Sequence, residues 1–147
     1  MTVLEQILTN KMLTTPALAW MTAQVLKTLV DAIRNHQFNP HLLLGTGGMP
    51  SAHSALVCGL AAAAGRTQGF DSPMFAVTVA LAAIVMYDAA GVRQAVDKQS
   101  EILTHLLSHV PKTHDDFDAF LEGLVGHTRI QVLGGALLGI IVAALWV

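Results

Sequence analysis

The order of apolar and polar positions divides the chain into long apolar segments of helical length, separated by short polar or glycine-rich segments. A first long helix is predicted over residues 12–33, with Pro16 close to a helix start after Thr14 and Thr15. Residues 36–49 then contain one asparagine, one proline and three glycines. This composition is typical of a loop.

Two further helices are expected after this loop. The second is predicted to begin at Pro50 or Ser51 and to run through an alanine-rich stretch to a stop at residues 65–66. After a polar turn, Asp71 or Ser72 is expected to cap the third helix, which has a proline in its first turn.

The third helix is almost wholly apolar over residues 75–86 and becomes polar towards residue 101. Residues 111–118 form the most polar stretch, and their aspartates suit the first turn of a short helix. The last helix, residues 130–147, is apolar after Gln131 and has about the length needed to cross the hydrocarbon core of a bilayer. Its small residues would allow a close approach to a neighbouring helix: Gly134, Gly135, Ala136 and Gly139.

The composition places these helices in a membrane. Hydrophobic residues make up 53% of the chain and charged residues only 12%, whereas soluble domains carry about 25% charged residues. Strand-type alternation is absent, so we predict an all-α fold: a small integral membrane bundle of about four to five helices, with residues 1–147 as one domain. A formal net charge of -2 lacks the basic excess of nucleic-acid-binding proteins. Lysine and arginine are scattered over several loops, which leaves the orientation open.

The first candidate for chemistry is the segment 47–54, Gly-Gly-Met-Pro-Ser-Ala-His-Ser. Its glycines leave room for a ligand beside the main chain, and Ser51 can offer a hydroxyl and a backbone N–H at a helix start, where anions bind. His53 would lie beside such an anion and could donate a proton to a leaving oxygen. The alternative is a capped helix that contains a histidine by chance.

A second polar cluster follows the apolar part of the third helix. Asp88 and Arg93 lie there with Gly91 between them, and charged groups at membrane depth usually mark a site. The planar guanidinium of Arg93 suits two phosphate oxygens at once. The alternative is an arginine at the membrane interface that is simply paired with Asp88 or Asp97.

The third cluster is Gly-His-Thr-Arg-Ile-Gln at 126–131, just before the last apolar helix. A neutral His127 could attack phosphorus, and Gln131, one helical turn later, could hold its other nitrogen. A histidine in this place can equally be a cap or an interface residue. His105 and His109 have the i, i+4 spacing of metal ligands but lack a paired carboxylate, so no metal site is predicted.

Three ordered motifs make the pattern specific. They are Gly-Gly-Met-Pro-Ser-Ala-His-Ser-Ala at 47–55, Val-Met-Tyr-Asp-Ala-Ala-Gly-Val-Arg at 85–93, and Gly-His-Thr at 126–128 with the following glycine-rich helix. Together they resemble the divergent branch of the type 2 phosphatidic acid phosphatases, which is related to the vanadium-dependent haloperoxidases. The resemblance extends from about Lys27 to the C-terminus.

The resemblance implies roles for individual residues. The first motif of the superfamily supplies phosphate ligands and corresponds to Lys27 and Arg34 in this chain, with Asn35 where proline is usual. The second motif of the superfamily implies that Ser51 binds phosphate and that His53 is the general acid.

The third motif is divided between two segments. Arg93 resembles its phosphate-binding arginine, preceded by Val92 where serine is usual, and His127 resembles its nucleophile. Gln131 stands where the superfamily has an aspartate that orients this histidine. A neutral amide lacks the charge that would stabilise an imidazolium, so Asp88 is a second candidate for that role.

The resemblance therefore implies a metal-independent membrane phosphatase that hydrolyses a lipid phosphate or an isoprenoid (di)phosphate through a histidine nucleophile. No cofactor is expected, although vanadate would bind as a phosphate mimic; vanadate-dependent oxidation is a weaker hypothesis for so short a chain. The expected partners are the lipid phosphate substrate and membrane lipids, and no nucleic acid is expected. The sequence leaves open whether the chain forms a homo-oligomer. The alternative is a catalytically degenerate membrane protein that binds phospholipid or an anion without turnover.

Overall fold

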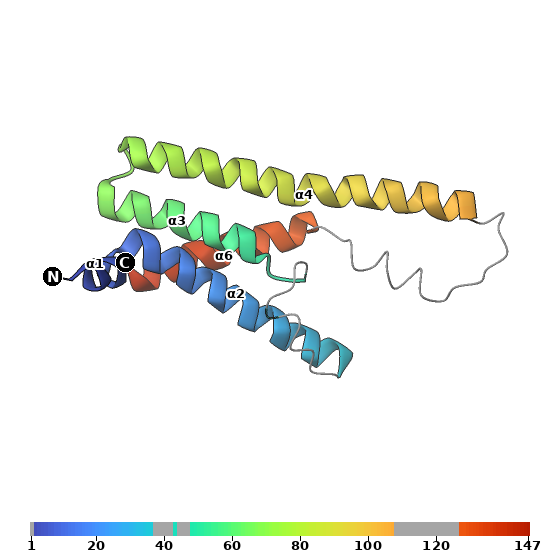
Figure 1. The fold of residues 1–147 in the computed structure, drawn as a ribbon, viewed down its shortest axis with the longest axis horizontal. Helices are drawn as coiled ribbons and strands as arrows, with labels where there is room; N and C mark the ends of the chain where they lie inside the picture. Colours follow the sequence, from blue (N-terminus) through green and yellow to red (C-terminus); the bar gives the residue numbers. More distant parts are fainter. Residues whose placement is uncertain (1, 37–42, 44–47, 108–126) are drawn as a thin grey trace.

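The fold is helical throughout the described part of the chain. The computed structural model describes residues 2–36, 43, 48–107 and 127–147, and within 92–107 it describes only the backbone and two side chains, those of Gln99 and Ile102. Five helices are described there (Figure 1): α1 (Val3–Thr9), α2 (Lys11–Asn35), α3 (Ala52–Gln68), α4 (Pro73–Leu107) and α6 (Arg129–Trp146). The prediction of an all-α bundle of four to five helices is confirmed.

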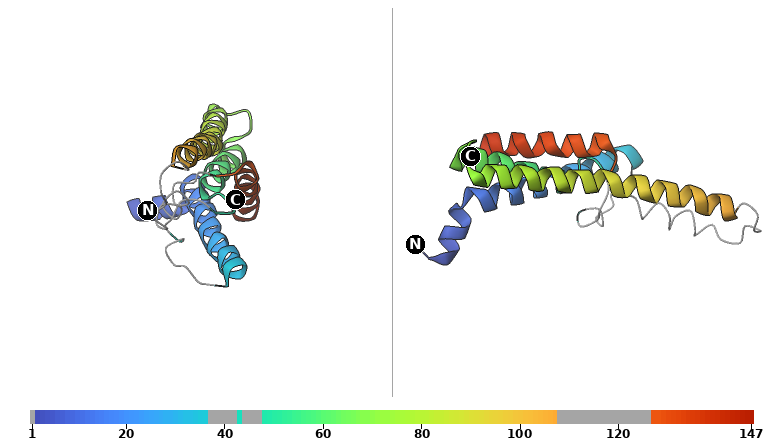
Figure 2. Two further views of the ribbon diagram at one scale, coloured as in Figure 1. Left: turned by 90° about the vertical axis from the view of Figure 1, so that its right-hand side faces the viewer. Right: turned by 90° about the horizontal axis from the view of Figure 1, so that it is seen from above.

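Helix α3 forms the centre of the bundle and contacts α2, α4 and α6 (Figure 2). Its buried residues are mostly alanine and glycine, which lets neighbouring backbones come close. Helix α6 also has small residues where it meets α3. A Cβ on Gly135 would overlap the Ser51 carbonyl group, and one on Gly139 would lie 2.7 Å from the Gly59 nitrogen. The predicted close approach of the last helix is therefore confirmed, and its partner is α3.

Two helices are long and apolar enough to cross a membrane, over Pro73–Gly91 in α4 and Arg129–Trp146 in α6. Both present uncovered apolar side chains to the outside of the bundle, among them Val77, Leu81, Ile84, Leu133, Leu137 and Ile140. Such large exposed apolar faces are unfavourable in water and favourable in lipid. The two termini of the chain lie at one end of the bundle, and α3 and α6 begin towards the other (Figure 1).

Two predicted helix ends are wrong, and in both cases another residue makes the cap. Helix α2 begins at Lys11 because the Asn10 side chain accepts a hydrogen bond from the Met12 N–H at 2.9 Å, so Pro16 lies inside the helix. Helix α3 continues past residue 65 to Gln68, and its C-cap is Gly69, which has a φ of 95°. Gly65 has a packing role instead, because a Cβ there would meet the Phe70 and Phe75 rings.

The start of α4 follows the prediction. Ser72 precedes Pro73, and its hydroxyl accepts a hydrogen bond from the Phe75 N–H at 3.2 Å. The helix then continues to Leu107. The short helix predicted over 111–118 lies outside the described residues.

Candidate active site

Lys27 enters the site from α2, and the turn before α3 closes over it. Its side chain is only 3% exposed. Gly48 lies against it with a φ of 79°, and a Cβ at Gly48 would lie 2.7 Å from Cγ and 2.8 Å from Cδ of Lys27. Only glycine fits this combination of a left-handed backbone and a close neighbour. Gly48 therefore serves to accommodate the lysine.

Ser51 fixes the N-terminus of α3. Its hydroxyl is the N-cap group and accepts hydrogen bonds from the Ser54 N–H at 3.4 Å and the Ser54 hydroxyl at 3.1 Å. Its backbone N–H donates to the Gln131 carbonyl at 3.0 Å, so the N–H that the sequence offered to an anion is used to join α3 to α6. The first-turn N–H groups of Ala52 and His53, which lack partners within any helix, remain at this end.

His127 is fixed by its backbone just before α6. Its N–H donates to the Ala89 carbonyl of α4 at 3.2 Å. Thr128 then caps α6 in a capping box with Gln131: the Thr128 hydroxyl accepts from the Gln131 N–H, and the Gln131 Oε1 accepts from the Thr128 N–H at 2.9 Å. These bonds hold His127 between α3, α4 and α6.

The two histidines of the second and third motifs meet at this point. The ring centroids of His53 and His127 are 5.8 Å apart, and the planes are inclined by 62° in an edge-to-face arrangement. His53 is exposed, whereas His127 is only 5% exposed. One ring is thus accessible to solvent protons and the other is largely shielded from them.

The surroundings of His127 favour its neutral form. Burial lowers the pKa of His127 below its ordinary value, and the charges of His53 and Lys27 act in the same direction. The nearby Gln131 side chain and the Gly48 backbone oppose this shift in part. A neutral imidazole has the free electron pair that a nucleophile needs.

The orientation of the His127 ring lacks one expected contact. Its Nδ1 is buried, and no hydrogen-bond partner for it lies among the described residues. The Gln131 Oε1 accepts from the Thr128 N–H, and the Gln131 side chain also acts on the His127 ring. Asp88, the second candidate for that role, is exposed on α4 and is not bonded to His127. Among the described residues, no carboxylate is bonded to the His127 Nδ1.

The remaining predicted phosphate ligands lie towards the same end of the bundle. Arg34 is exposed in the last turn of α2, where this helix diverges from α3 (Figure 1). Arg93 is one helical turn beyond Ala89, the residue that bonds to His127, and its side chain lies outside the described part. The backbone therefore brings the two halves of the divided third motif together.

Two polar residues of α2 were not predicted as part of the site. Gln24 and Thr28 are buried on the same face as Lys27, and the Gln24 Oε1 has no hydrogen-bond partner among the described residues. The sequence feature that could have indicated them is that they are polar residues within an otherwise apolar helix. No group of three or more possible metal ligands occurs in the described residues, and His109 lies outside them.

The described structure is thus a helical bundle with two helices of membrane-spanning length and a two-histidine site with a buried lysine at one end. The model of the Divergent PAP2 family matches residues 8–142, and the chain belongs to this family. It is similar to the "Uncharacterized membrane protein YuiD" of Bacillus subtilis (strain 168), with 33% identity over 92% of this chain and 93% of that protein. No solved structure matches the chain.

These findings confirm two predictions made from the sequence. The resemblance to the divergent type 2 phosphatidic acid phosphatases is confirmed by the family match. The integral membrane location is confirmed by the two apolar helices together with a relative that is named a membrane protein.

Proposed function

We propose that this chain, as a single membrane-embedded domain, hydrolyses a lipid phosphate or an isoprenoid (di)phosphate through a histidine nucleophile. The observation that carries the proposal is the pairing of His53 with His127, with ring centroids 5.8 Å apart, beside the buried Lys27. These residues come from three separate segments of the chain, and the family relation adds the expectation of phosphoryl chemistry.

In the first step, a ring nitrogen of neutral His127 attacks phosphorus. The nitrogen–phosphorus bond forms and the bond from phosphorus to the leaving oxygen breaks, while the His53 imidazolium donates its proton to that oxygen. The leaving oxygen is the alcohol oxygen of a lipid phosphate or the bridging oxygen of a diphosphate. In the second step, water attacks the phosphohistidine and neutral His53 takes the proton of the water. The nitrogen–phosphorus bond then breaks, which releases phosphate and restores both histidines.

Positive charge and backbone donors hold the phosphate oxygens during both steps. The Lys27 ammonium supplies charge in a shielded place, where it acts more strongly than in water. The first-turn N–H groups of α3 supply dipoles directed at the anion. The Ser51 hydroxyl, Arg34 and Arg93 are the further phosphate ligands of the proposal.

The place of the site in the bundle supports a membrane-bound substrate. His127 lies two residues before the apolar helix Arg129–Trp146 begins, and lipid headgroups lie at the level where such helices leave the hydrocarbon core. A phosphate attached to a lipid or isoprenoid chain would reach this level while its chain stays in the bilayer.

The test is phosphate release by purified protein in detergent with short-chain phosphatidic acid and with an isoprenoid diphosphate. We expect release by the unaltered protein and a loss of more than about 1000-fold in His127→Ala, which is the scale of losing a catalytic nucleophile. Leu133→Ala, at an exposed apolar position of α6, is the control and should retain activity. Equal release by the unaltered protein and His127→Ala would refute the proposal.

A second candidate function is binding without turnover, and one observation favours it. The His127 Nδ1 has no bonded carboxylate or amide among the described residues, so an imidazolium formed there would lack the usual stabilisation. In that case the protein would bind phosphatidic acid in equilibrium dialysis, His127→Ala would bind it as well, and neither protein would release phosphate.

A further inference from the structure

Helix α1 is a separate short element with its own caps. It spans Val3–Thr9, and a capping box closes its start: the Thr2 N–H donates to the Glu5 Oε2 at 2.8 Å, and the Glu5 N–H donates to the Thr2 hydroxyl at 3.3 Å. None of its residues is buried in the bundle. The helix is thus formed locally and not by packing on its neighbours.

The side chains of α1 are divided into two faces. Val3, Leu4, Ile7 and Leu8 lie on one side, because these positions recur at the spacing of a helical face. They are 74%, 64%, 48% and 64% exposed. The polar residues Glu5, Gln6 and Thr9 occupy the other side. Four large apolar side chains therefore lack a partner among the residues that the structure describes.

The position of α1 along the bundle is fixed by Lys11, the first residue of α2. The Lys11 Nζ lies 4.4 Å from the centre of the Trp146 ring and donates to the Trp146 carbonyl at 2.9 Å. Trp146 is the last residue of the apolar helix that can cross the membrane, and its Nε1 donates to the Thr14 hydroxyl at 3.2 Å. Tryptophan and lysine favour the boundary between lipid and water. The end of α1, which adjoins Lys11, therefore lies at the level of that boundary.

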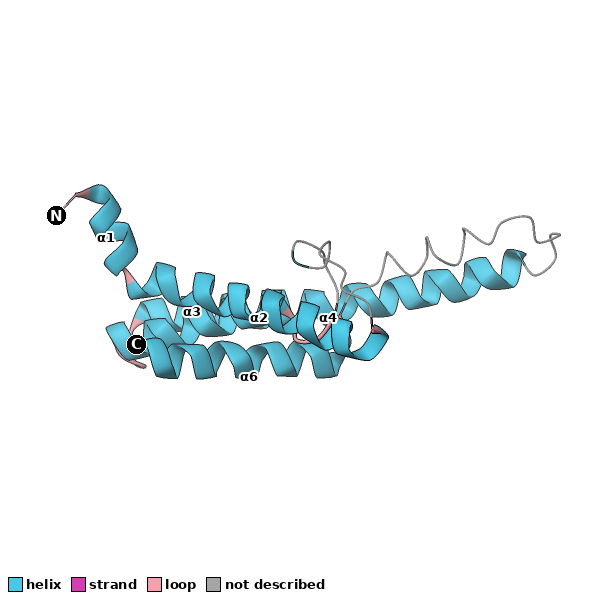
Figure 3. Ribbon diagram, turned by 90° about the horizontal axis from the view of Figure 1, so that it is seen from below, coloured by secondary structure: helices cyan, strands magenta, loops and turns pink. Residues whose placement is uncertain are grey.

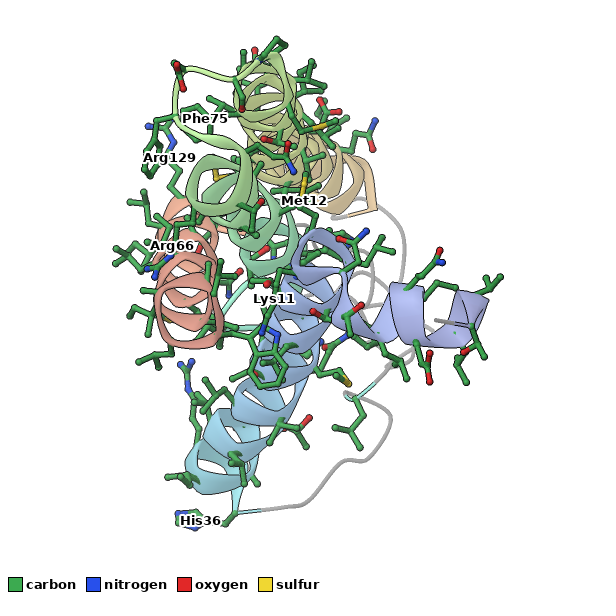
Figure 4. All side chains as sticks on the ribbon, turned by 90° about the vertical axis from the view of Figure 1, so that its left-hand side faces the viewer. Lys11, Met12, His36, Arg66, Phe75 and Arg129 are labelled. Atoms are coloured by element: carbon green, nitrogen blue, oxygen red, sulfur yellow. The ribbon has the colours of Figure 1, made fainter. Side chains whose placement is uncertain are left out.

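The direction of α1 fits the plane of this boundary. Viewed along the bundle from the end that carries Lys11, α1 runs sideways, away from α2, α3 and α6 (Figure 4). From below, it leaves the start of α2 at a steep angle (Figure 3). A helix that runs at a large angle to the bundle axis, at the level of the membrane surface, lies along that surface.

We propose that α1 is an interfacial helix whose apolar face enters the lipid leaflet at the end of the bundle opposite the two-histidine site. The partner is the surface of the same bilayer that α4 and α6 cross. A second copy of the chain is a weaker occupant, because a seven-residue helix is too small for the roughly 1,000 Å² of a stable protein interface. Glu5 is the only charged residue of the helix, so insertion relies on apolar contact and needs no anionic lipid.

The experiment places a nitroxide label on each face of α1. Cysteine is introduced at Leu4, Ile7 or Gln6 in a Cys58→Ala background, and each labelled protein is reconstituted into phosphatidylcholine vesicles. All three positions are exposed, so the labels leave the bundle intact. Relaxation of each label by oxygen, which concentrates in lipid, is compared with relaxation by a water-soluble nickel chelate.

We expect the labels at residues 4 and 7 to be relaxed mainly by oxygen and the label at residue 6 mainly by nickel. This pattern should not change when the ratio of protein to lipid in the vesicles is lowered. Nickel relaxation at all three positions would show that α1 lies free in water and would overturn the proposal. Protection from both reagents at residues 4 and 7, with spin–spin broadening that fades on dilution, would show a second copy and would also overturn it. Neither readout depends on phosphatase activity.

Discussion

Lys27 and His127 form the electrostatic pair on which the site depends. The lysine charge helps to lower the pKa of His127, and a lowered histidine pKa means that the folded protein favours the neutral ring. The stabilisation from this neutral ring is present above the unfolded pKa of about 6.5. It is lost as the pH falls from there through the lower pKa of the folded protein, because the unfolded chain binds more protons in that range. The protein should therefore become less stable below that pH.

Substitution of the lysine tests this link. Lys27→Met should raise the pKa of His127, since a positive neighbour is removed and the side chain keeps a similar length. Lys11→Met, at the other end of the same helix, should leave it unchanged. The measurement is an NMR titration of labelled histidines in detergent, with His127→Ala to assign the signal. Identical His127 midpoints in the two methionine variants would contradict the argument.

Gly48 links backbone conformation to the position of Lys27. Gly48→Ala should reduce the free energy of unfolding by about 1–2 kcal/mol, because its φ of 79° is left-handed, and should also reduce phosphate release, because the new Cβ displaces Lys27. Gly91→Ala is the control, since nothing lies within 4 Å of a Cβ there, and should raise stability by about 0.5–1 kcal/mol. Thermal unfolding and phosphate release in detergent are compared; equal effects would contradict this role of Gly48.

At the scale of helices, the contact between α3 and α6 positions the site. Gly139→Ala should destabilise the protein by about 1–3 kcal/mol, the usual cost of overpacking, because the added Cβ would overlap backbone atoms of Ala55 and Gly59. Gly134→Ala should be tolerated, since its nearest neighbour would be the flexible Met49 side chain at 3.4 Å. Thermal unfolding in detergent compares the two, and equal midpoints would mean that the α3–α6 contact is less tight than described.

The helices were predictable where periodicity and capping agree. The Ser72–Pro73 start of α4 is an example, because its cap chemistry is local. The stop at Gly65 was wrong because a glycine required for tertiary packing looks the same in sequence as one that ends a helix. Helix α1 was missed although its Thr-x-x-Glu signature is visible in the sequence, because a seven-residue helix adds little apolar periodicity.

The site was predictable in its members and less so in its contacts. His53 and His127 come together as the ordered motifs indicated, and Lys27 lies near them as the family resemblance implied. The use of the Ser51 N–H by Gln131 was not predictable, because it depends on how α3 and α6 meet. Residue types at fixed spacing indicate which chemistry is available, whereas pairings across helices follow from packing.

At the scale of the whole molecule, the helix arrangement places lysine and arginine residues, which are scattered in the sequence, at the two ends of the bundle. Lys11 and Arg66 lie at the end with the termini, and both donate to carbonyl groups near the end of α6. The positions towards the site end are Arg34, Arg93, Lys98 and Arg129. Segments that flank membrane helices carry more lysine and arginine on the cytoplasmic side. The site end should therefore face the cytoplasm.

Labelling of single cysteines checks this orientation. In a Cys58→Ala background, Asp71→Cys should react with an impermeant maleimide in intact cells, because it lies in the turn at the opposite end. Gln99→Cys, exposed beyond the apolar part of α4, should react only after the cells are permeabilised. The reverse pattern, or equal labelling of both, would contradict the predicted orientation.

The central claim, that His127 is a nucleophile, is tested most directly by trapping its phosphorylated form. Purified protein is mixed with phosphatidic acid labelled with radioactive phosphate, quenched in base and digested. We predict label on the peptide that contains His127, stable in base and lost in acid as for a phosphoramidate, and absent from His127→Ala. Phosphate release that proceeds with no label on His127, or label that persists in His127→Ala, would contradict the account.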